Sequence, residues 1–255
     1  MERRPPAARG PCTWGHVFCR RIALGSGRLS AEELLFDPVD LNAVRAALGC
    51  APELSERILG LGRVRLYAAG AHLLRQGDRP SALYLIILGR CHALVYGVDG
   101  QMVLLHELGP GDLFGALGGL DAVEEDADVV AVEEVRSFLL EAGVLVGLAE
   151  RHGCIGLALS RILLKRLRAT STRMFERAAL SASGRVCAEL LRRARAGEGL
   201  AIRPPPVLAE LGMQVGTTRE TVSRTVNALE RRGILRREPD ALVVVAPGRL
   251  EAEIL

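Results

Sequence analysis

The sequence predicts an α+β protein with an N-terminal antiparallel β-roll, a long dimerisation helix and a C-terminal winged helix-turn-helix. Three observations predict this fold class. Short apolar runs alternate with turn residues from about Gly62, a proline-free stretch with helical apolar spacing begins at Gly143, and a helix, turn, helix and two-strand pattern ends the chain. The expected divisions are a flexible N-terminal extension at 1–35, the roll at 36–142, the dimerisation helix at 143–178 and the winged helix-turn-helix at 179–255.

The composition of the 255 residues is that of a globular protein, with 49% hydrophobic and 25% charged residues. The longest stretches without a charged side chain, such as 80–89, have about ten residues, whereas a membrane-spanning helix needs about twenty. The sequence therefore predicts no membrane segment, and its N-terminus lacks the apolar run of a secretory signal. Six cysteines without a CxxC pair favour reduced thiols and a cytoplasmic protein.

The net charge of +3 is a sum of two opposite regions. Residues 101–150 contain eleven acidic residues and a single basic one, Arg136, whereas residues 161–240 contain 17 basic and 8 acidic residues. An acidic middle followed by a basic C-terminal third favours two domains, of which the second faces a polyanion.

The predicted roll consists of apolar runs of about four to twelve residues separated by turn signals such as Gly77-Asp78-Arg79-Pro80 and Asp99-Gly100. Short strands at regular spacing are typical of a small antiparallel barrel or roll. The runs are 64–67, 83–88, 92–96, 102–108 and 129–140.

One long helix is expected from 143 to about 174, because apolar residues recur there at helical spacing. The roll already has a core of its own, so this apolar stripe needs a partner, and the same helix in a second chain is the most economical one. The alternative is that the helix packs back on its own roll. The stripe consists of Leu145, Leu148, Ile155, Leu159, Ile162, Leu163, Leu167 and Met174.

The C-terminal third contains the pattern of a winged helix-turn-helix. Gly212 is small enough for a close helix crossing, Thr217 or Thr218 offers an N-cap hydroxyl, and Glu220 supplies a first-turn carboxylate. The expected elements are helices at 182–196, 207–214 and 219–232 and wing strands at 234–237 and 242–245.

The exposed face of the second motif helix presents Arg219, Glu220, Ser223 and Arg224. A helix-turn-helix places the first turns of this helix in the major groove, where Arg pairs with guanine and Glu accepts from cytosine. The alternative is an ordinary solvated charged face. The turn, the wing and the basic segment together favour DNA reading.

The segment from Leu211 to Arg224, LGMQVGTTRETVSR, resembles the DNA-reading motif of the Crp/Fnr family of bacterial transcription factors. The resemblance extends over about 55–250 and includes Gly89 and the run from Pro110 to Gly115. It implies a homodimer with a cyclic-nucleotide-binding-like sensory roll and with double-stranded DNA and RNA polymerase as partners. The sequence has no phosphate-cradling glycine loop, metal-spaced His cluster or nucleophile elbow, so we expect no enzymatic activity.

The resemblance also implies a role for each residue of the motif. The implied target is a palindrome of TTGA- or TGTGA-like half-sites. The alternative function is a sensory module that acts through protein contacts and retains a vestigial DNA domain. The implied base-reading residues are Arg219, Glu220, Ser223 and Arg224, and the implied phosphate contacts are Thr218 and Thr221.

The predicted effector pocket departs from the family pattern. Members that bind cyclic nucleotides carry a Glu after the last roll glycine, here Gly115, and an Arg followed by Ser or Thr ten residues later. In this sequence those positions hold Ala116, Asp126 and Ala127. An Asp in place of the phosphate-pairing Arg repels the ligand, so the sequence argues against control by cyclic AMP.

The sequence also bears on a nucleotide base, an iron–sulfur cluster, haem and a redox-sensitive thiol as features of the sensor. Thr170 and Ser171 match helix positions that meet the nucleotide base, and they fit a dimer seam equally well. An iron–sulfur cluster requires four converging thiolates, and Cys12 and Cys19 have no third cysteine nearby. Haem stays open as a cofactor, and Cys91 or Cys154 is alternatively a redox-sensitive thiol. The candidate haem ligands are His72, Cys91, His92, His106 and His152.

Overall fold

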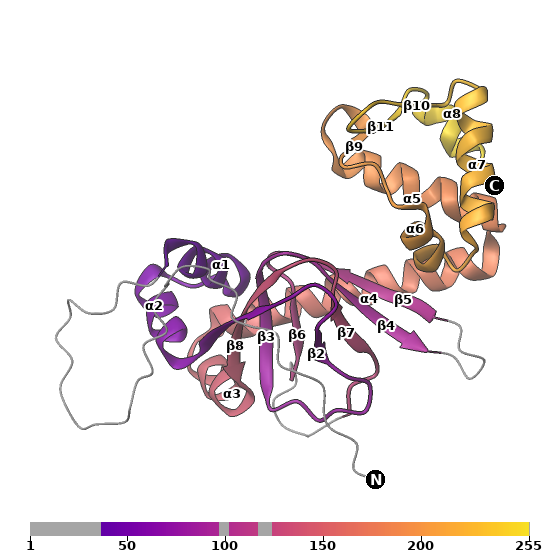
Figure 1. Ribbon diagram of the computed structural model, residues 1–255. Coiled ribbons are helices and arrows are strands. Elements are labelled where there is room, and N and C mark those ends of the chain that lie inside the picture. The colour runs from indigo at the N-terminus through magenta and orange to yellow at the C-terminus, as the bar shows by residue number, and fades with distance from the viewer. Residues whose placement is uncertain (1–36, 97–101, 117–123, 255) are drawn as a thin grey trace, which may run out of the picture. The chain divides into compact units, whose positions relative to one another are not determined.

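The computed structural model describes residues 37–96, 102–116 and 124–254 (Figure 1). The predicted extension at 1–35, with Cys12 and Cys19, and the turn at 99–100 lie outside these residues. The predicted fold class is confirmed, because two antiparallel sheets precede a long helix and a C-terminal helical unit with a small sheet.

The roll is built from two four-stranded sheets with the strand orders β1-β8-β3-β6 and β2-β7-β4-β5. The sequence predicted a single run at 129–140, which the structure divides between the two sheets, and it missed two strands of three residues each, β2 and β6. The strands are β1 Arg63–Tyr67, β2 His72–Leu74, β3 Ala82–Leu88, β4 Cys91–Tyr96, β5 Met102–Leu108, β6 Leu113–Gly115, β7 Asp128–Ala131 and β8 Val135–Glu141.

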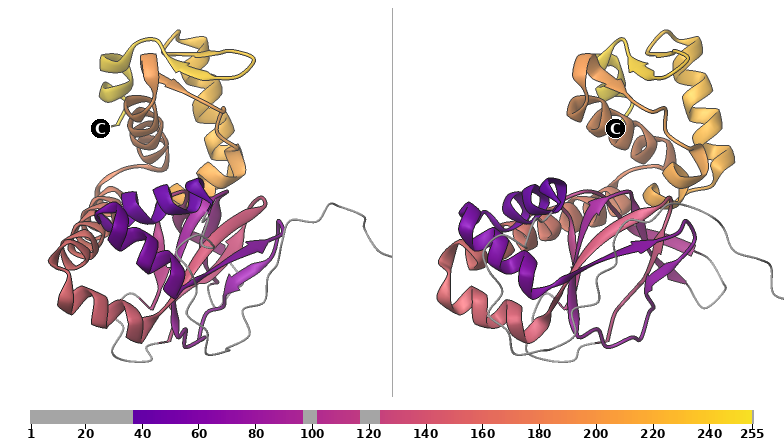
Figure 2. Two further views of the ribbon diagram at one scale, coloured as in Figure 1. Left: turned by 90° about the vertical axis from the view of Figure 1, so that its left-hand side faces the viewer. Right: turned by 60° about the vertical axis from the view of Figure 1, so that its left-hand side comes forward.

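Strand β3 is buried on both faces, which explains its unbroken apolar sequence. Leu83, Leu85 and Ile87 pack with the helices that cover the first sheet, whereas Ile86 points to the opposite face and packs between the two sheets. Two helices missed by the sequence analysis, α1 (Pro38–Leu48) and α2 (Pro52–Leu61), belong to this cover. Helix α1 also packs against the long helix α4, Gly153–Ala179 (Figure 2).

The single helix expected from 143 to 174 is wrong, because the chain bends by 115° between two helices. These are α3, Ala142–Arg151, and α4, Gly153–Ala179, with His152 in an extended conformation between them. The bend lets Leu145, Leu148 and Ile155 enter one core with the roll. The first half of the predicted stripe therefore follows the alternative interpretation and packs on its own roll.

From Leu163 onward the stripe lies on the surface. The side chains of Leu163, Leu167 and Met174 are 52%, 63% and 73% exposed, respectively. Among the described residues no single helix is long and apolar enough to cross a membrane, and α3 and α4 meet that criterion only as a bent pair.

The C-terminal unit has a core of its own, to which Leu190, Leu211 and Val222 each contribute a fully buried side chain. The predicted helix at 182–196 is found with the same bounds. The first motif helix is shifted by one residue at each end, whereas the second motif helix and both wing strands are each one residue shorter than predicted. A third strand, β9, and a last helix, α8, were missed. The elements are α5 Ala182–Ala196, a 3-10 turn at Glu198–Leu200, β9 Ala201–Ile202, α6 Leu208–Val215, α7 Arg219–Arg231, β10 Leu235–Arg237, β11 Leu242–Val244 and α8 Pro247–Ala252.

Candidate nucleic-acid interface

The turn between α6 and α7 is closed by local backbone chemistry. Gly216 ends α6 in the left-handed conformation, with φ of 67°. The Thr218 hydroxyl accepts a hydrogen bond from the backbone N–H of Thr221 at 3.3 Å, so Thr218 rather than Thr217 is the N-cap of α7. A Cβ at Gly212 would lie 2.9 Å from the carbonyl oxygen of Thr217, which confirms that the crossing needs a glycine.

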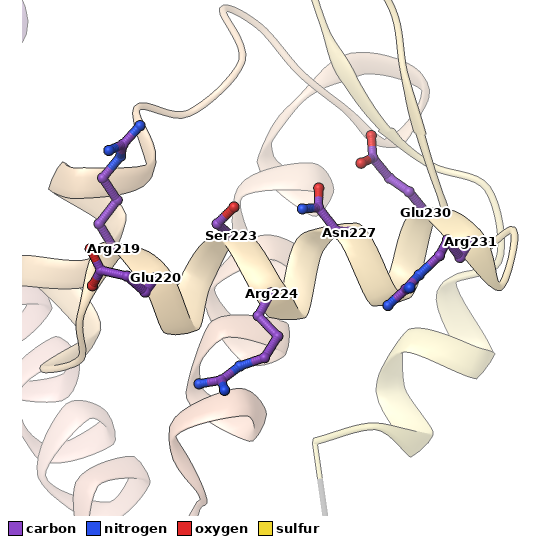
Figure 3. Close-up of a pocket in the computed structure, with 7 residues that line it drawn as sticks. All are labelled: Arg219, Glu220, Ser223, Arg224, Asn227, Glu230 and Arg231. Carbon is purple, nitrogen blue, oxygen red and sulfur yellow. The ribbon is translucent and has the colours of Figure 1, made fainter.

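Helix α7 separates a buried face from a polar one. Val222, Val226 and Leu229 are at most 2% exposed and hold the helix on the C-terminal core. The polar side chains line one open concave surface along the helix and project from it in two rows (Figure 3). They are Arg219, Glu220, Ser223, Arg224, Asn227, Glu230 and Arg231.

The arginines of this polar face differ from those on and beside the wing. Arg203, Arg236 and Arg237 each form an ion pair with an Asp or Glu in the C-terminal unit. In the described part of the chain, Arg219 and Arg224 form none, and the only side-chain partner of Arg224 is the Thr221 hydroxyl at 3.4 Å. Their guanidinium groups are therefore available to an external acceptor.

Glu220 lies beside these arginines as a charged acceptor. Hydrogen bonds from its own backbone N–H and from the Thr218 hydroxyl lower the pKa of its carboxyl group. The side chain is therefore ionised at neutral pH, in the form that accepts a hydrogen bond from a cytosine amino group.

The sequence analysis missed Arg185 of α5, which holds the turn of the motif in place. Its Nε donates to the carbonyl of Val215 at 2.7 Å, and its Nη2 donates to the carbonyl of Gly216 at 3.0 Å. Its Nη1 donates to the carbonyl of Leu180, directly after α4, at 3.0 Å. One guanidinium thus joins the end of α4 to the turn that precedes α7, a role that sequence spacing alone does not reveal.

Four of the predicted effector-pocket residues lie at or near the ends of strands in the roll. Gly115 ends β6 with φ of 82°, and a Cβ there would lie 2.7 Å from the carbonyl of Ala82. Ala116 is half-buried, Asp126 is exposed and Ala127 is buried. No cationic side chain therefore comes from the loop positions where the family places its phosphate-binding Arg.

The acidic residues around this loop are less repulsive than their number suggests. Glu124 forms an ion pair with Arg79 at 2.8 Å. Asp128 lies 3.3 Å from the Nδ1 of His72 and accepts the backbone N–H of Gln76 at 2.7 Å.

A cation that the sequence analysis missed, Arg166, reaches this region from α4 and donates to the carbonyl of Leu113 in β6. Burial lowers the pKa of Arg166, and the nearby Asp112 and Glu125 oppose that shift. Thr170 and Ser171 lie further along the same helix with exposed side chains.

Among the described residues, no group of three or more His, Cys, Asp or Glu side chains could hold a metal ion. His72 is engaged by Asp128, and burial raises the pKa of the Cys91 thiol to about 12. His92 is buried, and its Nε2 has no hydrogen-bond partner.

A sensory roll joined through a long helix to a winged helix-turn-helix defines a DNA-binding transcription regulator. The family model of the cyclic nucleotide-binding domain matches residues 64–152, and that of the Crp-like helix-turn-helix domain matches residues 184–253. The cyclic AMP receptor protein of Thermus thermophilus is 35% identical over 205 residues, which are 80% of this chain and 93% of that protein. The chain therefore belongs to the Crp/Fnr family.

One further relative agrees with this assignment, and one solved structure shares the fold. A CRP-like cAMP-activated global transcriptional regulator of Mycobacterium tuberculosis is 29% identical over 72% of this chain and 84% of its own. The structure of FixK2 from Bradyrhizobium japonicum shares the fold, with a TM-score of 0.66 at 21% identity over 76% of this chain and 98% of its own. The relatives are transcription regulators, a class of proteins that are not typically enzymes.

Replacing Arg185 with Ala should destabilise the C-terminal unit by about 2–3 kcal/mol, because three backbone carbonyls lose a charged donor. Urea unfolding followed by circular dichroism measures this loss. Arg195→Ala is the matched control, since its pair with Glu251 is exposed and should change stability by less than about 1 kcal/mol. Equal losses in the two variants would show that Arg185 does not hold the turn.

Proposed function

We propose that this protein is a homodimeric regulator that reads a palindrome of TTGA- or TGTGA-like half-sites with α7. The observation that carries the proposal is the polar face of α7, where Arg219 and Arg224 have no ion pair among the described residues and flank the ionised Glu220. An arginine that already paired with a carboxylate would have to break that pair before it could bind a base. The free guanidinium groups of α7 carry no such cost.

Each side chain of the reading face has a chemical counterpart in the major groove. An Arg pairs in bidentate fashion with O6 and N7 of guanine, and a Glu carboxylate accepts from N4 of cytosine. Ser223 offers a hydroxyl on the same face. Thr218 and Thr221 are the proposed phosphate contacts, although the Thr218 hydroxyl also caps α7.

The exposed face of α4 supports a homodimer. Six side chains on this face follow one another along α4 at spacings of three, four and seven residues, which is the heptad pattern of a two-helix seam. In this arrangement Ser171 is a small seam residue between two larger ones, and Thr170 lies beside it. A two-fold axis along α4 duplicates α7, so the DNA target repeats as a palindrome. The members are Leu157, Leu164, Leu167, Ser171, Met174 and Ala178.

We further propose that cyclic AMP does not control this regulator, unlike the relatives that are named after it. Ala116 offers no carboxylate for a ribose hydroxyl, Ala127 offers no hydroxyl, and Asp126 carries the wrong charge for a phosphate. Arg166 reaches this region from α4, but it is bound to the carbonyl of Leu113 and attracted by Asp112 and Glu125. The roll then senses another ligand or none, and haem is one candidate.

The alternative is a sensory module that acts by protein contact with a vestigial DNA domain. It is not favoured, because the cap, the turn and the reading face of α7 are all present. RNA polymerase is the protein partner expected of a transcription regulator.

Replacing Arg224 with Ala should cost about 1–3 kcal/mol at a TTGA-N6-TCAA-like duplex and relax specificity at one base pair. Arg231→Ala is the matched control, since it removes the same charge two turns further along the same exposed face. We expect it to weaken cognate and scrambled duplexes alike. Fluorescence anisotropy at several salt concentrations measures both effects. If the variants discriminate between the duplexes equally well, Arg224 does not read a base.

Replacing Leu167 with Glu should convert the dimer to a monomer, because it places charges face to face in the proposed seam. Sedimentation velocity reports the association state directly. Leu66→Glu on β1 is the control, since this leucine is 70% exposed, compared with 63% for Leu167, and lies outside the proposed seam. A dimer that survives Leu167→Glu would rule out the α4 seam.

Isothermal titration calorimetry should detect no binding of cyclic AMP to the wild-type protein with a Kd below about 1 mM. The double variant Asp126→Arg with Ala127→Ser restores the missing cation and hydroxyl, and we expect it to bind more tightly. A micromolar Kd for the wild type would contradict the proposed loss of nucleotide control.

A further inference from the structure

Two cysteines that are distant in the sequence lie side by side in the roll. The sulfur atoms of Cys50 and Cys154 are 3.7 Å apart, although 104 residues separate them along the chain. Both thiols are reduced, and they share a weak S–H···S hydrogen bond. A disulfide has a sulfur–sulfur distance of about 2.05 Å, so each sulfur needs to move by less than about 1 Å to form one.

The two cysteines lie at junctions between helices. Cys50 directly follows Gly49, the left-handed C-cap of α1, and precedes α2. Cys154 is the second residue of α4, just after the bend at His152. A bond between them would therefore fasten the junction of α1 and α2 to the start of the long helix.

The thiols of Cys50 and Cys154 differ in their exposure to solvent, which fits a thiol–disulfide exchange in two steps. Cys154 is half-buried and packs at the edge of the core, whereas Cys50 is 6% exposed. Burial, reinforced by the neighbouring Cys154, raises the pKa of the Cys50 thiol to about 12. The outer thiol is thus the one that meets an oxidant, and the inner thiol is held beside it.

We infer that Cys50 and Cys154 form a redox-active pair that a low-molecular-weight disulfide, such as glutathione disulfide, oxidises to an intramolecular disulfide. The Cys154 thiolate attacks the small disulfide, forms a mixed disulfide and releases one small thiolate. The Cys50 sulfur, after losing its proton, attacks the Cys154 sulfur and releases the second small thiolate. In sum, two protein thiols are oxidised, and one small disulfide is reduced to two thiols.

The bond would stabilise the roll by restraining the unfolded chain. A loop of about 100 residues is in the range where a cross-link removes much conformational freedom from the unfolded state. For a protein of this size we expect the midpoint of thermal unfolding of the oxidised form to lie about 5–15 °C above that of the reduced form.

The test uses the full-length protein in glutathione redox buffers, followed by acid quenching, alkylation and digestion without reductant. The expected product is one cross-linked peptide pair that joins Cys50 to Cys154, accompanied by the rise in the unfolding midpoint. Cys154→Ser should abolish both. This position is chosen for substitution because it lies at the edge of the core and tolerates a hydroxyl better than Cys50.

Cys91→Ser is the matched control, since Cys91 is buried and has no sulfur neighbour among the described residues. It should leave the Cys50–Cys154 product unchanged. The inference is overturned if both thiols stay alkylatable in the oxidising buffer, if the disulfide joins other cysteines or two chains, or if Cys154→Ser shows the same rise in the midpoint. DNA binding by the reduced protein is measured separately, so failure of the proposed function is distinguishable from failure of the thiol pair.

Discussion

Helix α3 and the start of α4 pack against the roll, and this packing determines which surface of α4 stays exposed. Leu145, Leu148 and Ile155 enter the same core on opposite sides of a 115° bend. Because of the bend, the first part of the apolar stripe is buried against the roll, whereas Leu167 and Met174 in its later part are exposed. Exposure of a contiguous apolar face to water is unfavourable, and such faces commonly mark interaction sites. The roll thus anchors a helix whose exposed face is the proposed seam of the homodimer.

The arginines of the C-terminal unit have two different roles: some are bound within the protein, and others on α7 are free to contact DNA. Arg185 donates hydrogen bonds to three backbone carbonyls and fixes the turn, and Arg237 forms an ion pair with Glu230. Arg219 and Arg224 are left without such partners in the described chain. A basic segment is therefore divided into cations that hold the motif together and cations that can contact DNA. Net charge alone does not distinguish the two groups, whereas hydrogen-bond geometry does.

Local patterns in the sequence predicted the elements that local chemistry determines. The bounds of α5, the close crossing at Gly212 and the N-cap hydroxyl before α7 follow from helical periodicity, residue size and capping, and the structure agrees with them. The bend at His152 was missed because it depends on a core assembled from distant segments. Arg185, Arg166 and the Cys50–Cys154 pair were missed for the same reason, since each acts on a partner that only the folded chain brings near.

We propose that a dimer built on α4 presents two copies of α7 to DNA. Selection of bound duplexes from a random-sequence pool tests it most directly, because no target is assumed. We expect enrichment of an inverted repeat whose half-site centres are about one helical turn apart, 10–10.5 base pairs. An unenriched pool, a lone half-site or a direct repeat would rule out the α4 dimer as the DNA-binding form.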